Sequence, residues 1–114
     1  MNTSITKLCT FAAAHSLPGH QGRCRELHGH TYTLEVTVGG TLRQEGPAAG
    51  MVLDFADLER AIEDVVLRRL DHTYLNDVLE VVPTAEAIAG WAFTALREYG
   101  LPVTKVRMWE SPTS

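Results

Sequence analysis

Eight consecutive residues, TYTLEVTV at positions 31–38, alternate between polar and apolar side chains without a break. Successive side chains of a β-strand point to opposite faces of a sheet, so this period of two predicts a half-buried strand. Its apolar face consists of Tyr32, Leu34, Val36 and Val38. A strand with one polar face is typical of an antiparallel sheet, so the rest of the chain must supply its neighbours and a covering layer.

Three other segments are predicted to be strands. Residues 4–14 (SITKLCTFAAA) indicate a less regular partner, 51–54 (MVLD) a short strand, and 103–109 (VTKVRMW) a fourth strand. Each segment contains β-branched residues, which fit the pleated surface of a sheet.

Two helices are predicted between the third and the fourth strand. The first follows Asp54, which suits an N-cap, and the second follows Thr84 as N-cap and ends at Gly100 and Pro102. Apolar side chains recur in both at helical spacing, and we expect this stripe to lie on the sheet. Its members are Leu58, Ala61, Ile62, Val65, Val66, Leu70, Ile88, Ala89, Ala92 and Leu96.

The predicted order is strand, strand, strand, helix, helix, strand. Strands in a run with helices grouped after them indicate an α+β domain, with both helices on one face of a four-stranded antiparallel sheet. We expect residues 1–114 to form a single domain of this kind. So small a sheet keeps open edges and a partly polar second face, which self-association would cover, and we therefore predict an oligomer.

The amino-acid composition limits the kinds of molecule that the chain can bind and the compartment in which it is expected. The formal net charge of -4 argues against broad nucleic-acid binding, which needs lysine and arginine massed on one face. It still allows a small anionic ligand in a locally basic pocket. No apolar run indicates export or membrane insertion, and two cysteines are too few for a disulfide framework. We therefore expect a cytoplasmic protein.

The segment CRELHGH at positions 24–30 is the strongest chemical signal. His28 and His30 lie at the entry to the alternating strand, where the period of two sends both side chains to one face. His15, at the end of the first predicted strand, can supply a third imidazole if the two strands are neighbours. Three neutral imidazoles without a fourth protein ligand are typical of catalytic zinc, which keeps a coordination position for water or substrate.

The two cysteines and His20 are predicted to have different roles. Cys24 lies between Arg23 and Arg25, which favour its thiolate form, and it suits either a fourth metal ligand or a reactive group. Spacing alone does not decide between these two roles. Cys9, in a predicted strand, is expected to be a small core residue, and His20, among turn residues, is expected to be a surface residue.

Two acidic residues lie near predicted element ends. Asp71 directly precedes His72, and an aspartate beside a histidine can fix its tautomer and raise its basicity, which gives a proton-transfer pair. The alternative is a helix end that simply carries polar side chains. Glu110, after the last strand, is either a rim residue or a carboxylate that accepts two N–H donors from a heterocycle.

Six sequence blocks occur together over nearly the whole chain: FAAAHSL, CRELHGHTYTLEVTV, GMVLDF, LDHTYLND, PTAE and VRMWE. Together they resemble the 6-pyruvoyl-tetrahydropterin synthase family, and most closely its 6-carboxy-tetrahydropterin synthase branch. The branch is chosen because only three residues separate Cys24 from His28, where the pyruvoyl branch usually has a longer insertion. The sequence ends at Ser114, soon after Glu110, where the family pattern leads us to expect a short final strand.

The resemblance implies a tunnelling fold, in which the sheets of three subunits join into a barrel and two trimers stack into a hexamer. It also implies a role for nine residues. They are His15, His28 and His30 for zinc, Cys24, Asp71 and His72 for catalysis, and Thr84, Glu86 and Glu110 for pterin binding.

The implied substrate is 7,8-dihydroneopterin triphosphate. In the carboxy branch, a zinc-dependent lyase converts it to 6-carboxy-5,6,7,8-tetrahydropterin, acetaldehyde and triphosphate, in 7-deazapurine or queuosine-type biosynthesis. Candidates to hold the triphosphate are Arg23, Arg25, Lys7 and Lys105. Two alternatives stay open, a pyruvoyl-type synthase that eliminates triphosphate and a non-catalytic module that binds zinc or pterin.

Overall fold

The computed structural model describes residues 2–114, and its framework is a ribbon of two long antiparallel strands. These are β1 (Thr3–His15) and β2 (His28–Gly40). β4 (Val103–Trp109) pairs antiparallel with β2, and β3 (Thr73–Tyr74) pairs in parallel with β1. The order across the sheet is β3-β1-β2-β4, which confirms a four-stranded, mostly antiparallel sheet.

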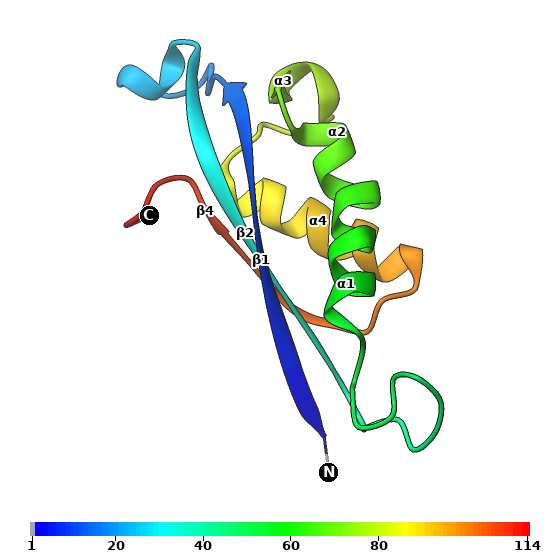
Figure 1. The fold of residues 1–114 in the computed structure, drawn as a ribbon. Coiled ribbons are helices and arrows are strands. Elements are labelled where there is room, and N and C mark those ends of the chain that lie inside the picture. Colours follow the sequence, from blue (N-terminus) through cyan, green and yellow to red (C-terminus); the bar gives the residue numbers. More distant parts are fainter. Residues whose placement is uncertain (1) are drawn as a thin grey trace.

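The helices cover one face of this ribbon (Figure 1). The two main ones are α1 (Phe55–Ile62) and α4 (Ala85–Tyr99). Shorter elements complete the chain: the 3₁₀ turn η1 (Arg23–Arg25), the π-helical turn η2 (Glu63–Leu67), α2 (Arg68–Leu70) and α3 (Leu75–Val78). None of the helices within residues 2–114 is long and apolar enough to span a membrane.

The predicted caps form as expected. The Asp54 carboxylate accepts a hydrogen bond from the Ala56 N–H at 2.8 Å, and the Thr84 hydroxyl accepts one from the Ala87 N–H at 3.1 Å. Each satisfies a backbone donor that has no partner inside its helix. α4 ends at Gly100, whose φ of 116° lies in the left-handed region that a residue with a Cβ rarely adopts.

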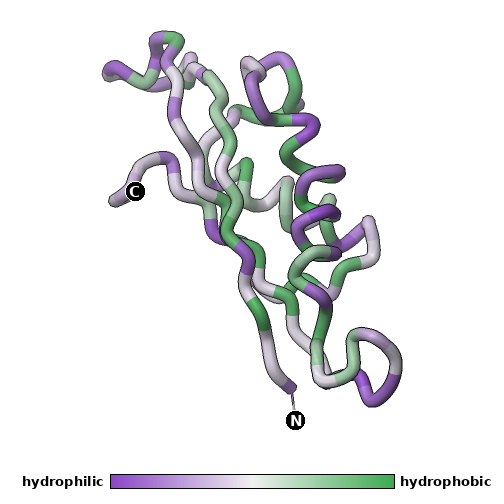
Figure 2. The backbone as a smooth tube through the Cα atoms, viewed as in Figure 1, coloured by the Kyte–Doolittle hydropathy of each residue, from purple (hydrophilic) through white to green (hydrophobic). Residues whose placement is uncertain are grey.

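The core lies between the ribbon and the helices. All four apolar residues of the alternating segment are fully buried, which confirms its predicted period. Facing them are buried side chains of the helical layer: Leu58, Ile62, Val66, Leu70, Ile88, Ala92 and Leu96. Figure 2 shows the same division, with the helix that begins at α1 apolar toward the strands and hydrophilic on its outer side.

One predicted strand is wrong. Residues 51–54 form no strand, and the chain there folds back on itself, with the Arg43 N–H donating to the Met51 carbonyl at 2.9 Å. Asp54 then caps α1 at once, so no length remains for a ladder with the sheet. The sheet instead gains its fourth strand from β3, which follows α2 and was not predicted. The observed order of the main elements is therefore strand, strand, helix, strand, helix, strand.

The face of the sheet turned away from the helices is largely polar. The Thr6 and Thr37 hydroxyls, opposite each other on β1 and β2, lie 2.8 Å apart. The Arg107 guanidinium lies 3.5 Å from the Glu35 carboxylate. No helix of the described chain covers this face (Figure 1).

Candidate metal and catalytic site

Three imidazoles converge where the ribbon ends. His15 is the last residue of β1 and lies in register opposite His28, the first residue of β2, while His30 follows two residues later on the same face. Their ligand nitrogens all lie within 4.8 Å of one another. Among residues 2–114, this is the only group of three or more His, Cys, Asp or Glu side chains that is so close. The convergence predicted from the sequence is confirmed.

Backbone carbonyls fix the orientation of two of the rings. His15 Nδ1 lies 2.7 Å from the Pro83 carbonyl oxygen, and His28 Nδ1 lies 2.7 Å from the Glu26 carbonyl oxygen. Because a carbonyl only accepts, each Nδ1 carries a proton, and in the neutral ring Nε2 then presents a lone pair. These two Nε2 atoms lie 3.0 Å apart. Two lone pairs at this distance repel each other unless a cation lies between them.

The third ring also presents an unpaired nitrogen. His30 Nε2 is buried and has no hydrogen-bond partner among the described residues. Burial is the main cause that lowers the pKa of His30, which keeps the ring in the neutral form that a metal ligand requires. The Glu110 carboxylate lies just beyond hydrogen-bond distance, 3.7 Å from His30 Nε2 and 3.6 Å from His15 Nε2. The donor set fits a divalent cation such as zinc.

The floor beneath the imidazoles is aromatic. Tyr32 is fully buried and stacks on Phe11, with ring centroids 4.9 Å apart. The Tyr32 hydroxyl lies 3.3 Å from His15 Nδ1, and burial raises the pKa of this phenol. These buried rings keep water from one side of the imidazoles, and a lower dielectric constant on that side strengthens the attraction between a bound cation and an anionic oxygen.

Cys24 lies in η1, the turn between β1 and β2. Its side chain is partly buried, and its backbone carbonyl accepts a hydrogen bond from the Leu17 N–H at 2.7 Å. Its sulfur does not belong to the group of ligand atoms formed by the three imidazoles. The fourth-ligand alternative therefore gains no support from the geometry of this chain.

Asp71 and His72 form a pair that is bound to β1. Asp71 Oδ1 lies 2.9 Å from His72 Nδ1 and accepts a hydrogen bond from the Ala12 N–H at 3.0 Å. The His72 N–H donates to the Ala12 carbonyl at 2.6 Å. These bonds, first that from Ala12 and then those from His72, lower the pKa of Asp71. The carboxylate stays ionised and holds the proton on His72 Nδ1.

The backbone of His72 is unusual. Its φ of 59° makes it the only residue other than glycine with a positive φ in the described chain. Residues in such sparsely populated conformations cluster at functional sites. The His72 side chain is 82% exposed, and it lines an open depression of about 550 Å³ that His30 also lines. A proposed acid–base residue and a proposed metal ligand therefore border the same hollow.

Comparison with known proteins agrees with this geometry. Residues 4–114 match the sequence profile of the family described as 6-pyruvoyl tetrahydropterin synthase. The chain belongs to this family.

Two curated members of the family, both 6-carboxy-5,6,7,8-tetrahydropterin synthases, are similar to this chain. That of Synechocystis is 45% identical, with 96% of this chain and 88% of the relative covered. That of Haemophilus influenzae is 36% identical, with 96% and 94% covered. The solved structure of 6-pyruvoyl tetrahydropterin synthase from Caenorhabditis elegans matches with a TM-score of 0.86 at 28% identity, over 99% of this chain and 91% of that one.

The residues that the family resemblance assigns to pterin binding have distinct surroundings. Thr84 uses its hydroxyl to cap α4, while Glu86 in the first turn of that helix is exposed. The segment PTAE touches the imidazoles through the Pro83 carbonyl that binds His15. Glu110 faces the imidazoles as described above. The pterin-binding roles of these residues stay predictions.

The lysines proposed for the triphosphate lie far from the imidazoles. A strand rises about 3.3 Å per residue, so Lys7 lies about 26 Å along β1 from His15. Lys105 is opposite Thr37, seven residues and about 23 Å along β2 from His30. Within one chain, only Arg23 and Arg25 of the proposed arginines and lysines belong to the same end of the ribbon as the imidazoles.

His20, the fifth histidine, lies outside the site, as predicted. It is exposed, and its Nδ1 accepts a hydrogen bond from the Gly22 N–H at 2.8 Å. The carbonyls of Pro83 and Glu26, by contrast, are functional groups that the sequence analysis missed. Every residue carries a backbone carbonyl, so no residue type could have indicated them.

Proposed function

We propose that this chain is a zinc-dependent 6-carboxy-5,6,7,8-tetrahydropterin synthase that converts 7,8-dihydroneopterin triphosphate to 6-carboxytetrahydropterin, acetaldehyde and triphosphate. The observation that carries this proposal is the convergence of three imidazoles, whose ligand nitrogens lie within 4.8 Å of one another and include the buried, unpaired Nε2 of His30. The carboxy product is proposed because the two relatives described above, at 45% and 36% identity, are 6-carboxy-5,6,7,8-tetrahydropterin synthases.

Zinc would be held by His15, His28 and His30. When bound, it supplies Lewis-acid polarisation of the oxygens on the substrate side chain. The carbonyls of Pro83 and Glu26 keep the first two rings in the tautomer that this requires.

Proton transfer is assigned to Cys24 and to the pair of Asp71 and His72. Asp71 is ionised and keeps the proton of His72 on Nδ1, so Nε2 of His72 can accept a proton from the substrate and later return it. Cys24 acts as the second proton carrier.

Substrate orientation is assigned to Glu110, with Thr84 and Glu86 lining the pocket. A carboxylate accepts two N–H donors of the pterin ring in a fixed plane, which directs the side chain of the pterin toward the imidazoles. Arg23 and Arg25 carry the charge that the triphosphate requires, because they flank Cys24 at this end of the ribbon.

The proposed enzyme is an oligomer, a hexamer of two stacked trimers whose sheets join into barrels. β3 pairs with β1 only at Ala13 and Ala14, so most of that edge is open, and β4 ends the sheet on the other side. Open edges and an uncovered polar face favour pairing with another copy. The exposed side chain of His72 would then be enclosed by a neighbouring subunit.

The test is to incubate the purified protein with 7,8-dihydroneopterin triphosphate, with and without a chelator, and to identify the products. Release of acetaldehyde that the chelator abolishes supports the proposal. Triphosphate without acetaldehyde indicates a pyruvoyl-type synthase. Binding of zinc or pterin without turnover indicates a non-catalytic module.

A further inference from the structure

A second group of contacts lies next to the imidazoles, where β1 ends. The Ser16 N–H donates to Asn76 Oδ1 at 2.9 Å, and Asn76 Nδ2 donates to the Ser16 carbonyl at 2.9 Å. One planar carboxamide thus pairs with both backbone groups of a single residue. Asn76 belongs to α3, sixty residues along the chain from Ser16.

The two bonds continue the hydrogen bonding along this edge of β1 as far as Ser16, two residues beyond Ala14. β3 pairs with β1 at Ala13 and Ala14, and the ladder then ends. The Asn76 side chain takes the place of the next strand residue, because it offers an acceptor and a donor side by side, as a backbone does. Ser16 is 8% exposed, so water does not replace these partners freely.

The position of this contact matters because Ser16 directly follows His15. The His15 ring is held at Nδ1 by the Pro83 carbonyl, but the direction in which its Cα–Cβ bond leaves the strand depends on the backbone at residues 15 and 16. A shift of the strand end would move His15 Nε2 away from His28 Nε2, from which it is now 3.0 Å distant. Residues that do not touch the ion but orient its ligands change the affinity of the site for the metal.

We propose that Asn76 is a positioning residue of the metal site, which fixes the end of β1 and through it the His15 ring. The inference rests on the metal site proposed above. It differs from a purely structural role, in which Asn76 would stabilise the fold without altering the geometry of the ligands.

The test compares Asn76→Ala and Asn76→Asp with wild type and with Tyr74→Phe. Tyr74→Phe is the matched control, because it removes a 2.8 Å hydrogen bond to the Ser16 hydroxyl and leaves both backbone bonds of Ser16 intact. The metal is removed with a chelator, and Co²⁺ and Zn²⁺ are titrated back. Affinity is measured together with the visible absorption spectrum of the Co²⁺ form, which reports ligand geometry.

We expect Asn76→Ala to weaken metal binding by about tenfold or more and to shift the Co²⁺ spectrum. Asn76→Asp keeps the size and the acceptor, but its second carboxylate oxygen would face the Ser16 carbonyl where the amide donated, so metal binding should weaken here too. Tyr74→Phe should bind within about twofold of wild type, because it leaves the Ser16 backbone bonds in place. The rise in melting temperature on adding saturating zinc gives a readout even for a destabilised variant, and it should shrink for Asn76→Ala.

Two negative results have different meanings. If wild type binds neither Co²⁺ nor Zn²⁺ through its histidines, the proposed function itself fails. If wild type binds the metal and both Asn76 variants match it in affinity, spectrum and zinc-induced rise in melting temperature, Asn76 has only a structural role and the inference is overturned.

Discussion

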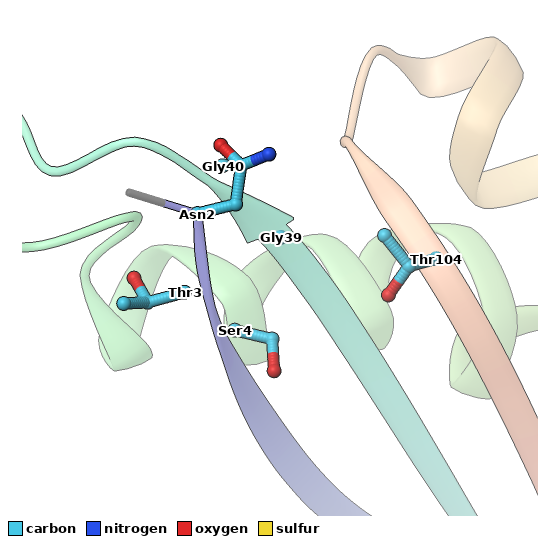
Figure 3. Close-up of a pocket in the computed structure, with 6 residues that line it drawn as sticks. All are labelled: Asn2, Thr3, Ser4, Gly39, Gly40 and Thr104. Atoms are coloured by element: carbon cyan, nitrogen blue, oxygen red, sulfur yellow. The ribbon is translucent and has the colours of Figure 1, made fainter.

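The two ends of the β1–β2 ribbon each have an open hollow, yet they differ in chemistry. At the His15 end, the depression beside His72 has a volume of about 550 Å³. At the opposite end, a hollow of about 460 Å³ is lined by Asn2, Thr3, Ser4, Gly39, Gly40 and Thr104 (Figure 3). The second hollow has no ionisable side chain, so it offers no acid, base or strong metal ligand.

Each end also has one buried side-chain atom without a hydrogen-bond partner. Within residues 2–114 these atoms are His30 Nε2 and Thr3 Oγ1. The imidazole nitrogen lies beside two other ring nitrogens within 4.8 Å, whereas no such cluster surrounds the hydroxyl. A buried, unpaired atom therefore indicates a function only where other ligand atoms converge on the same point. The size of the hollow does not distinguish the His15 end from the Thr3 end, because both hollows are of similar volume.

Removal of a ligand should have the largest effect. His28→Ala should reduce bound zinc from about one ion per chain to almost none and abolish turnover, because two imidazoles alone do not hold the ion firmly. Zinc is measured by elemental analysis of the purified protein, and turnover by product formation.

Two controls test whether this effect belongs to one end of the ribbon. His20→Ala removes a histidine outside the cluster, and Thr104→Ala changes the opposite hollow. Both should keep zinc and turnover. Zinc loss in either variant as large as that of His28→Ala would contradict the contrast between the two ends.

The second largest effect is expected from Cys24. Cys24→Ala should lower turnover by about 10²-fold, a magnitude typical for the loss of an acid–base group, while zinc stays bound. Cys9→Ala is the matched control, since Cys9 lies in the middle of β1 and outside the site. If Cys24→Ala also lost its zinc, the thiol would be a metal ligand, and the site would have four protein ligands.

The sequence predicted the features that depend on local patterns. The alternation of residues 31–38 determined which side chains of β2 are buried, and Asp54 and Thr84 marked the starts of the helices. The same period of two placed His28 and His30 on one face, and the pairing of neighbouring strands brought His15 to them. All but the last of these follow from a spacing of a few residues, whereas the approach of His15 depended on β1 and β2 being neighbours.

Other features arise from contacts that no spacing reveals. β3 has only two residues, and it is held to β1 in part by the bonds of Asp71 and His72 to Ala12. Neither hydrophobic period nor strand propensity can indicate so short a strand. MVLD is twice as long as β3, but its last residue, Asp54, is already the cap of α1. Tertiary contacts decided between the two segments, as they often do for short strands.

The next largest effect is expected on stability at low pH, and it should come from the His15 end of the ribbon. Hydrogen bonds lower the pKa of Asp71, so the stability that this carboxylate contributes is present above the ordinary aspartate pKa. It is lost as the pH falls through the lowered value. In the metal-free protein, the difference in stability between wild type and Asp71→Ala should therefore be larger at neutral pH than in strong acid.

The check is denaturant unfolding of both proteins over a range of pH, with hydrogen exchange of two amides as a local probe. The Ala12 amide, which donates to Asp71, should exchange faster in Asp71→Ala, while that of Gly39 at the other end should be unchanged. A stability difference that stays constant with pH would show that ionisation of Asp71 makes no contribution.

The smallest effect is expected at the opposite end of the ribbon. Thr3→Val replaces a buried, unpaired hydroxyl with a methyl group of similar shape. Leaving such a group unpaired costs about 1–3 kcal/mol, so the substitution should raise the free energy of unfolding by up to about 1 kcal/mol near a strand end. Zinc content and turnover should not change, because β1 separates Thr3 from His15 by twelve residues, about 40 Å. A loss of stability would mean that the Thr3 hydroxyl has a partner in the assembled protein, and the opposite hollow would then be an interface and not an unused end of the sheet.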